Sequence, residues 1–287
     1  MTSDEYREQL QKQIDEEIAR QQDGSAAALA SAAPAQTPQD LLQVLADKTE
    51  SASARLAALH ALQQLSFNVP LFAEIRPAFL EILRTVIDDP DALLREQAVE
   101  ALAQEKDEYV QRRLLAGLSG QEKPLVDDQN AILFLGYDVH AEHYPILRKL
   151  AQDSPDAGTR REAVQALAAD PHSANLLFDI YDNKGEDDEV RSASASALMN
   201  VAPEKFEERA KQAVVDESDA ENVRAASLTA LTYFAPEAIE KDKGFVEQVK
   251  GVEAAMAPPD AALSAASDEE ASPLAKAVRK FRSRYDR

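Results

Sequence analysis

Few residues of this chain have types and spacing that could do chemistry. His140 and His143 are three positions apart with Glu142 between them. Two imidazoles and a carboxylate on one side of a helix could ligate a metal ion. The same residues are also typical of a polar, solvent-exposed helix start, and we favour that interpretation. Cys is absent, which excludes thiolate metal sites, cysteine nucleophiles and a disulfide framework.

Sequence motifs of catalysis are missing as well. There is no glycine-rich phosphate loop, no G-x-S-x-G elbow and no H-E-x-x-H motif. Adjacent acids such as Asp127 and Asp128 are common, but among 52 Asp and Glu residues they are best explained as solvated loop residues. Spacing alone singles out no general acid or base. The sequence therefore predicts no catalytic residue, no cofactor and no metal, and we favour a non-enzymatic role.

One pattern organises most of the chain: an Arg, a small residue three positions on, Ala six on and Leu seven on. It recurs five times, starting at Arg55, Arg95, Arg160, Arg191 and Arg224. Successive copies are 40, 65, 31 and 33 residues apart, and the step of 65 contains a degenerate copy with Asp128 in the Arg position. A period in this range is typical of stacked supersecondary units, none of which can bury its apolar face alone.

Each copy has the spacing of a helix. Positions 0, 3 and 7 share one helical face, and position 6 lies close to it. Small residues at positions 3 and 6 let a neighbouring helix approach, and the leucine at position 7 fills the gap. Asp91, Asp156 and Asp187 precede three of these helices as N-caps. A second helix follows each motif helix, often started by a proline. We predict helical hairpins of roughly thirty residues and a buried set of leucines: Leu62, Leu102, Leu135, Leu167, Leu198 and Leu231.

Two of the connecting helices have features of their own. Residues 71–88 have the pattern of one long helix with Pro77 inside. Proline removes a backbone donor and crowds the preceding turn, so we expect a kink or a break there. Residues 109–119 predict a shorter helix that stops near Gly120.

The consensus D-x-x-V-R-x-x-A-x-x-A-L resembles the HEAT repeat in its short bacterial form. Residues 187–198 carry the clearest copy and depart from it only at Ser194. Over residues 39–256 the resemblance implies an all-α, right-handed solenoid of about six hairpins, with the motif helix on the concave side. It also implies that the motif Arg and the preceding Asp form ladders between repeats. We therefore interpret these arginines as structural.

HEAT-like proteins serve many functions, so the resemblance by itself does not assign one. We favour a protein-binding scaffold or adaptor that uses its concave face. The alternative is a lyase-type or chaperone-type accessory that acts on a pigment-bearing or other cofactor-bearing protein, because short HEAT repeats also occur in phycobilin lyases and their relatives.

Composition limits the partners. The chain has 287 residues, a net charge of −21 and no Trp. An acidic surface repels phosphate backbones, which argues against general nucleic-acid binding. Residues 1–10 have no apolar signal-peptide core, and no apolar run is long enough to span a membrane. We expect a cytoplasmic protein.

The termini differ from the repeats. Residues 1–23 predict an amphipathic helix, residues 24–38 an Ala/Ser/Pro linker and residues 257–273 an acidic Pro/Ala/Ser linker. Residues 274–287 hold six Lys and Arg against one Asp, with Leu274, Val278, Phe281 and Tyr285 in one stripe. This predicts a basic amphipathic helix. Either terminal helix could dock on the solenoid or on a partner.

The candidate binding site follows from the same numbering. Counted from the Arg position of each motif helix, positions +1, +2 and +5, together with −3 and −2 at its start, are expected to face the concave groove. The degenerate copy is the most apolar, so we expect its exposed apolar residues at the centre of the groove and acids at the rim. The candidate partner-binding residues are Leu125, Val126, Gln129, Asn130, Leu133, Arg161, Glu162, Gln165, Asp188 and Glu189.

Overall fold

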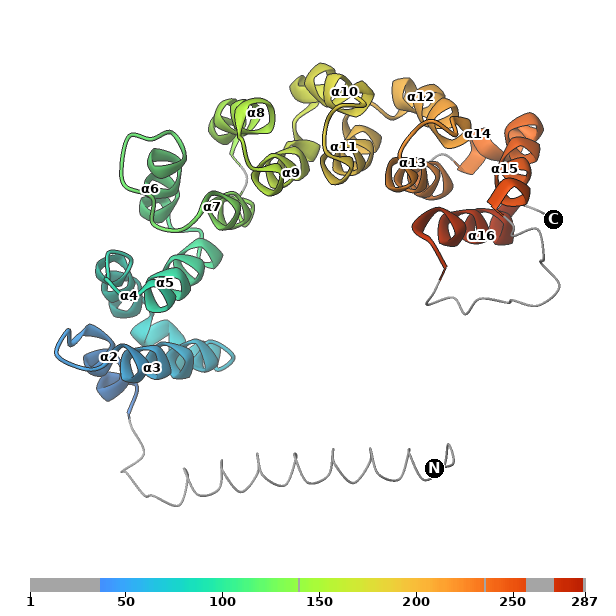
Figure 1. Cartoon of the computed structure of the whole chain (residues 1–287). Coiled ribbons are helices and arrows are strands. Elements are labelled where there is room, and N and C mark those ends of the chain that lie inside the picture. The colour runs from blue at the N-terminus through green and yellow to red at the C-terminus, as the bar shows by residue number, and fades with distance from the viewer. Residues whose placement is uncertain (1–36, 139, 235, 257–270, 286–287) are drawn as a thin grey trace, which may run out of the picture. The chain divides into compact units, whose positions relative to one another are not determined.

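The computed structural model describes residues 37–138, 140–234, 236–256 and 271–285, and within these ranges every regular element is a helix (Figure 1). The predicted helix at residues 1–23 and most of both predicted linkers lie outside the described residues. The chain divides into two compact units, Met1–Thr85 and Val86–Arg287. The repeat pattern predicts a single solenoid over residues 39–256, and the boundary between the two units falls within this range.

Unit 1 begins with a capped hairpin, α2 (Pro38–Ala46) and α3 (Ala52–Leu65). The Asp40 N–H donates to Thr37 Oγ1 (3.2 Å) and the Thr37 N–H donates back to Asp40 Oδ2 (2.8 Å). This reciprocal capping satisfies two backbone donors that have no partner inside the helix. Leu45 from α2 and Leu62 from α3 are fully buried, as the motif predicts for Leu62.

The third helix of unit 1, α4 (Val69–Val86), continues through Pro77 without a break. The expected break does not occur because Pro77 lies on the exposed side of the helix. The carbonyl that loses its partner can be hydrated there. On the opposite side Phe72 and Phe79 are buried and pack edge to face, with ring centroids 5.8 Å apart. This contact links the helical turns before and after Pro77.

Unit 2 contains twelve further α-helices within the described residues: α5 (Ala92–Gln104), α6 (Glu108–Leu118), α7 (Asp128–Leu135), α8 (Tyr144–Asp153), α9 (Ala157–Ala166), α10 (Ala174–Asp182), α11 (Asp188–Val201), α12 (Pro203–Val215), α13 (Glu221–Phe234), α14 (Pro236–Lys241), α15 (Lys243–Met256) and α16 (Pro273–Tyr285). Short 3-10 turns occupy Ala141–His143, Leu167–Ala169 and Pro171–Ser173. The helix predicted at 109–119 is confirmed as α6, and Gly120 follows it with φ +71°.

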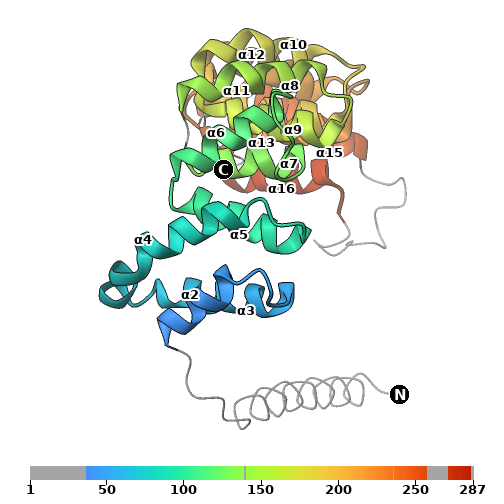
Figure 2. The same cartoon turned by 90° about the vertical axis from the view of Figure 1, so that its left-hand side faces the viewer.

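The motif helices α5, α7, α9, α11 and α13 lie side by side as an inner row, and α8, α10 and α12 form an outer row (Figures 1 and 2). Each outer helix packs against the motif helix that follows it, as in α8 with α9 and α10 with α11. The predicted caps are present: Asp91, Asp156 and Asp187 accept hydrogen bonds from backbone N–H groups of α5, α9 and α11. Helix α10 differs slightly, because Pro171 starts a 3-10 turn and the α-helix begins at Ala174.

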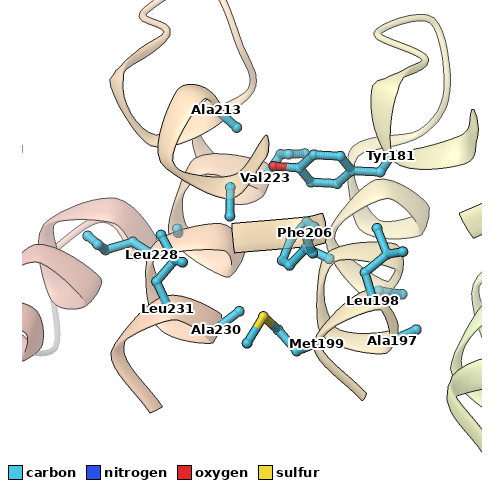
Figure 3. Close-up of a cluster of buried hydrophobic side chains, with 14 of the residues drawn as sticks. Tyr181, Ala197, Leu198, Met199, Phe206, Ala213, Val223, Leu228, Ala230 and Leu231 are labelled. Atoms are coloured by element: carbon cyan, nitrogen blue, oxygen red, sulfur yellow. The ribbon is translucent and has the colours of Figure 1, made fainter. Parts of the chain in front are cut away.

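The core of unit 2 runs between the two rows. The motif leucines Leu102, Leu135, Leu167, Leu198 and Leu231 are all buried, as predicted. Figure 3 shows Leu198, Phe206 and Tyr181 converging where α10, α11 and α12 meet, and the rings of Tyr181 and Phe206 pack edge to face at 5.1 Å. The Tyr181 hydroxyl lies 2.7 Å from Ser227 Oγ, which itself donates to the Val223 carbonyl. Tyr181 is therefore the donor, and burial raises its pKa to about 12.

The C-terminal helix α16 extends the inner row. It packs against α13 and α15, and Leu274, Val278 and Phe281 are fully or almost fully buried. The Tyr285 hydroxyl donates to the Thr232 carbonyl of α13 at 2.9 Å. Helix α16 therefore docks on the repeats, which is one of the outcomes expected for this basic helix.

Candidate partner-binding face

The motif arginines hold the repeats together. Arg191 is buried, and its Nε donates to the Tyr181 carbonyl at the end of α10 (2.9 Å). Its two terminal nitrogens donate to Asp219, just before α13. Arg160 makes the equivalent link forward, to Glu186 Oε1 at 2.6 Å. These guanidinium groups are committed to packing between repeats, so the structural interpretation of Arg160 and Arg191 is confirmed.

The degenerate repeat is joined to its neighbours differently. Asp128 replaces the arginine, and the neighbouring Gln129 donates from Nε2 to Asp156 Oδ2 at the start of α9 (3.0 Å). Helix α9 approaches closely here, because a Cβ added to Gly158 would lie 2.5 Å from the Gln129 side chain. Glycine at position 158 therefore makes room for the Gln129 link.

Leu125 is buried, with only 5% of its surface exposed, so its predicted place at the exposed centre of the groove is wrong. Arg95 from α5 explains the difference: its Nε donates to the Leu125 carbonyl at 2.8 Å. This bond ties the backbone of the segment before α7 to the preceding repeat, and the Leu125 side chain is buried there. Val126 is half-buried.

Leu133 is the apolar centre that remains on this face. Its side chain is 51% exposed on α7. Asn130 and Tyr137, one turn on either side of Leu133, both reach α5: Asn130 Nδ2 donates to Glu96 Oε1 at 3.2 Å, and the Tyr137 hydroxyl lies 3.5 Å from Glu100 Oε1. An exposed leucine is thus framed by polar side chains that contact two carboxylates.

The next two motif helices continue this face with charged and amide groups. Arg161 on α9 is 3.1 Å from Glu162 and 4.0 Å from Glu189 on α11. Gln165 and Asp188 are exposed. We define the inner face as the accessible predicted residues together with the contacted carboxylates: Gln129, Asn130, Leu133, Arg161, Glu162, Gln165, Asp188, Glu189, Glu96 and Glu100.

Sequence reasoning left Glu96 and Glu100 out of the candidate site. Their positions follow the same rule, because they are +1 and +5 relative to Arg95. Applying the numbering to the repeat before the degenerate copy would have found both. The contacts of Asn130 and Tyr137 with these carboxylates, in contrast, are visible only in the folded chain.

His143 is not at a solvent-exposed helix start as we had expected. It is 1% exposed, and its ring packs edge to face against His140 with centroids 5.3 Å apart. Burial lowers the pKa of His143, and the nearby His140 lowers it further. Within the described ranges no group of three or more His, Cys, Asp or Glu side chains is arranged to hold a metal ion.

Comparison with known proteins supports the repeat assignment. Residues 112–199, which include α7, α9 and most of α11, match the family model for HEAT repeats. Residues 112–199 are HEAT repeats. The inner face, apart from Glu96 and Glu100, lies inside the matched region, and so does the degenerate copy at Asp128. No curated protein matches the chain significantly by sequence.

Two solved structures are similar in fold to these HEAT repeats and their flanking helices. One is the complex of CpcE and CpcF of phycocyanin lyase from Nostoc, at 18% identity and a TM-score of 0.43, covering 88% of this chain and 96% of that chain. The other is human deoxyhypusine hydroxylase in complex with glycerol, at 15% identity and a TM-score of 0.36, covering 87% and 96%. Both TM-scores are too low to support a functional inference. In the described part of the chain, no helix has the length and apolarity needed to cross a bilayer.

Proposed function

We propose that this protein is a protein-binding scaffold whose partner lies across the inner face of unit 2. The observation that carries the proposal is the exposed Leu133, framed by Asn130 on α7 and by Tyr137 just after it. Fully burying a leucine side chain stabilises a complex by roughly 1.5–3 kcal/mol. An apolar centre inside a polar rim is the usual arrangement of a protein interface.

The charge of the inner face indicates the chemistry of the partner. Glu96, Glu100, Glu162, Asp188 and Glu189 provide five carboxylates around one guanidinium, that of Arg161. The chain as a whole carries −21. Such a surface attracts a segment with Lys or Arg and repels an acidic one. The expected ligand is a basic segment with an apolar side chain that covers Leu133.

The motif arginines are not part of the proposed partner-binding surface. They are used inside the array, so the inner face can vary in sequence without loosening the repeats. This separation of packing residues from exposed positions +1, +2 and +5 is what allows repeat proteins to present an extended binding surface.

A peptide-display selection on the full-length chain tests the proposal. We expect selected peptides to carry Lys or Arg on both sides of an apolar residue, with binding weakened at least about tenfold by Leu133→Glu, since a charge there prevents burial of the apolar centre. Phe67→Glu is the matched control, because Phe67 is 90% exposed and belongs to unit 1. Equal binding of the selected peptides to wild type and Leu133→Glu would contradict the proposal.

A further inference from the structure

A cavity of about 360 Å³ lies between the rows of unit 2, where two motif helices stop early. Helices α7 and α9 have 8 and 10 residues, whereas α11 and α13 have 14 each. The final α-helical turn of α11 therefore has no α-helical counterpart here: α9 continues as the 3-10 turn Leu167–Ala169, and α7 ends at Leu135 before Gly136. The volume falls within the roughly 300–1,000 Å³ range of ligand pockets.

The cavity lining is mostly apolar with three polar groups. Ile132 and Leu135 come from α7, Leu147 from α8, and Ala166, Ala168 and Ala169 from the end of α9 and the turn after it. The polar groups are His143, Gln165 and Asn200. An apolar lining with a few converging polar groups is the usual composition of a ligand site. Gln165 also belongs to the inner face, so the cavity and that face adjoin.

The His143 side chain gives independent support for a ligand at this cavity. The imidazole is buried, and its Nε2 has no hydrogen-bond partner among the described residues. An unpaired buried polar atom costs free energy unless a ligand or water satisfies it. Since burial keeps the ring neutral, one ring nitrogen is a donor and the other an acceptor. A hydroxyl can match either tautomer, because it both donates and accepts.

We propose that this cavity receives the phenol ring of a tyrosine side chain of the partner, and that the His143 ring turns on binding so that its Nε2, which is closed to water in this structure, is hydrogen-bonded to the hydroxyl. The inference rests on the proposed function for the source of the ring. A flat ring fits an apolar space between helices, and the hydroxyl supplies the missing partner. A tyrosine buried in a pocket is a common anchor of protein interfaces.

The cavity itself is tested with p-cresol, the side-chain analogue of tyrosine, and with toluene, which lacks the hydroxyl. NMR of the histidine-labelled full-length chain is expected to show saturable shifts of the His143 signals, with p-cresol binding roughly five- to tenfold more tightly than toluene. His143→Phe is expected to remove this difference. Equal affinities for the two compounds in the wild type, or no binding of p-cresol, would overturn the proposal.

Blocking the mouth gives a second variant that leaves the core in place. Ala169 is an exposed lining residue, so Ala169→Phe is expected to abolish the p-cresol shifts without lowering the melting temperature. Ala254→Phe is the matched control, because Ala254 is exposed on α15 and does not line the cavity. Shifts that persist in Ala169→Phe would place p-cresol elsewhere and overturn the assignment.

The source of the ring is tested by repeating the peptide selection with Ala169→Phe. We expect peptides selected by the wild type to be enriched in tyrosine, and peptides selected by Ala169→Phe to keep the basic residues but lose that enrichment. Basic, apolar peptides without tyrosine enrichment would overturn the tyrosine assignment and leave the scaffold proposal standing. If no peptides are selected, both the scaffold and the tyrosine source fail, even if p-cresol binds.

Discussion

Arg191 donates a hydrogen bond to each carboxylate oxygen of Asp219, at 2.6 and 3.0 Å, and so joins α11 to the start of α13. Both side chains are almost fully buried, 3% and 6% exposed. Burial alone would raise the pKa of Asp219, but the hydrogen bonds from Arg191 and from the Ala220 N–H outweigh it and hold the pKa below its usual range. The pair is thus a bidentate connection between successive helical hairpins.

Arg191→Ala is expected to lower the free energy of unfolding by about 3–5 kcal/mol, because it leaves the Asp219 carboxylate buried and unpaired. Arg161→Ala is the control: Arg161 makes an exposed 4.0 Å pair with Glu189, of a kind worth about 0–1 kcal/mol. Urea unfolding followed by circular dichroism measures both. Equal losses of unfolding free energy in the two variants would show that Arg191 contributes no more to stability than an exposed charge. The double variant Arg191→Met/Asp219→Leu is expected to recover much of the loss.

The motif leucines are expected to dominate stability. Leu198 is fully buried, so Leu198→Ala removes buried methyl groups and leaves a cavity, which costs roughly 2–5 kcal/mol. Leu133→Ala makes the same chemical change at a side chain that is 51% exposed, and is expected to cost less than about 1 kcal/mol. Thermal unfolding of the two variants provides the comparison, and an unchanged melting curve for Leu198→Ala would be inconsistent with this packing.

Helix α16 is expected to protect the end of the array. Val278→Asp places a charge at a fully buried position and should detach the helix, because an unpaired charge is costly to bury. Hydrogen exchange should then accelerate in α13 and α15, which contact α16, more than in α7. Ser283→Asp on the exposed side of α16 serves as control. Unchanged protection of α13 in Val278→Asp would contradict the docking.

Stability should fall on mild acidification because of His143. Above about pH 6.5, the ordinary pKa of histidine, the ring is neutral in both the folded and the unfolded chain. The protonation of His143 then takes nothing from the free energy of unfolding. As the pH falls below that value, the unfolded chain takes up a proton that the folded chain resists, since burial lowers the folded pKa. Stability is then lost at up to about 1.4 kcal/mol per pH unit until the folded pKa is passed.

Replacing the ring isolates this effect. His143→Phe should flatten the dependence of the unfolding free energy on pH just below about pH 6.5, where the neutral ring resists the proton. Aspartates with lowered pKa values, such as Asp219 and Asp170, titrate at more acidic pH in the folded chain. The groups near His143 are His140, Glu142 and Asp138, and all three are retained in the variant. An equal slope in wild type and His143→Phe would show that another group is responsible.

Much of the fold could be predicted because the repeat encodes it locally. Leu62 and Leu231 are more than 160 residues apart, yet both are buried, because spacing along one helix determines which side chains share its apolar face. The caps at Asp91 and Asp187 could be predicted equally well, since a cap involves only neighbouring residues. The choice between a break at Pro77 and one continuous helix α4 stayed open, because it depends on which side of the helix faces water.

The binding face was predicted in part. Leu133, Gln165 and Asp188 are accessible as the numbering requires, but Leu125 is not. Its backbone carbonyl accepts a hydrogen bond from Arg95, thirty residues earlier, which holds this segment against the preceding repeat. No local pattern reports such a contact, because the backbone carbonyl that accepts it is the same for every residue type.

The sequence by itself determined that the chain is a helical repeat protein, and which face of each motif helix is buried. Both depend on periodic spacing within about ten residues, which is the range of helical geometry. The burial of His143, the cavity beside it and the packing of α16 against α13 are evident only in the folded chain. These features depend on where separate helices end and meet, and that is set by the combined packing of segments distant in the sequence rather than by the preference of any one of them.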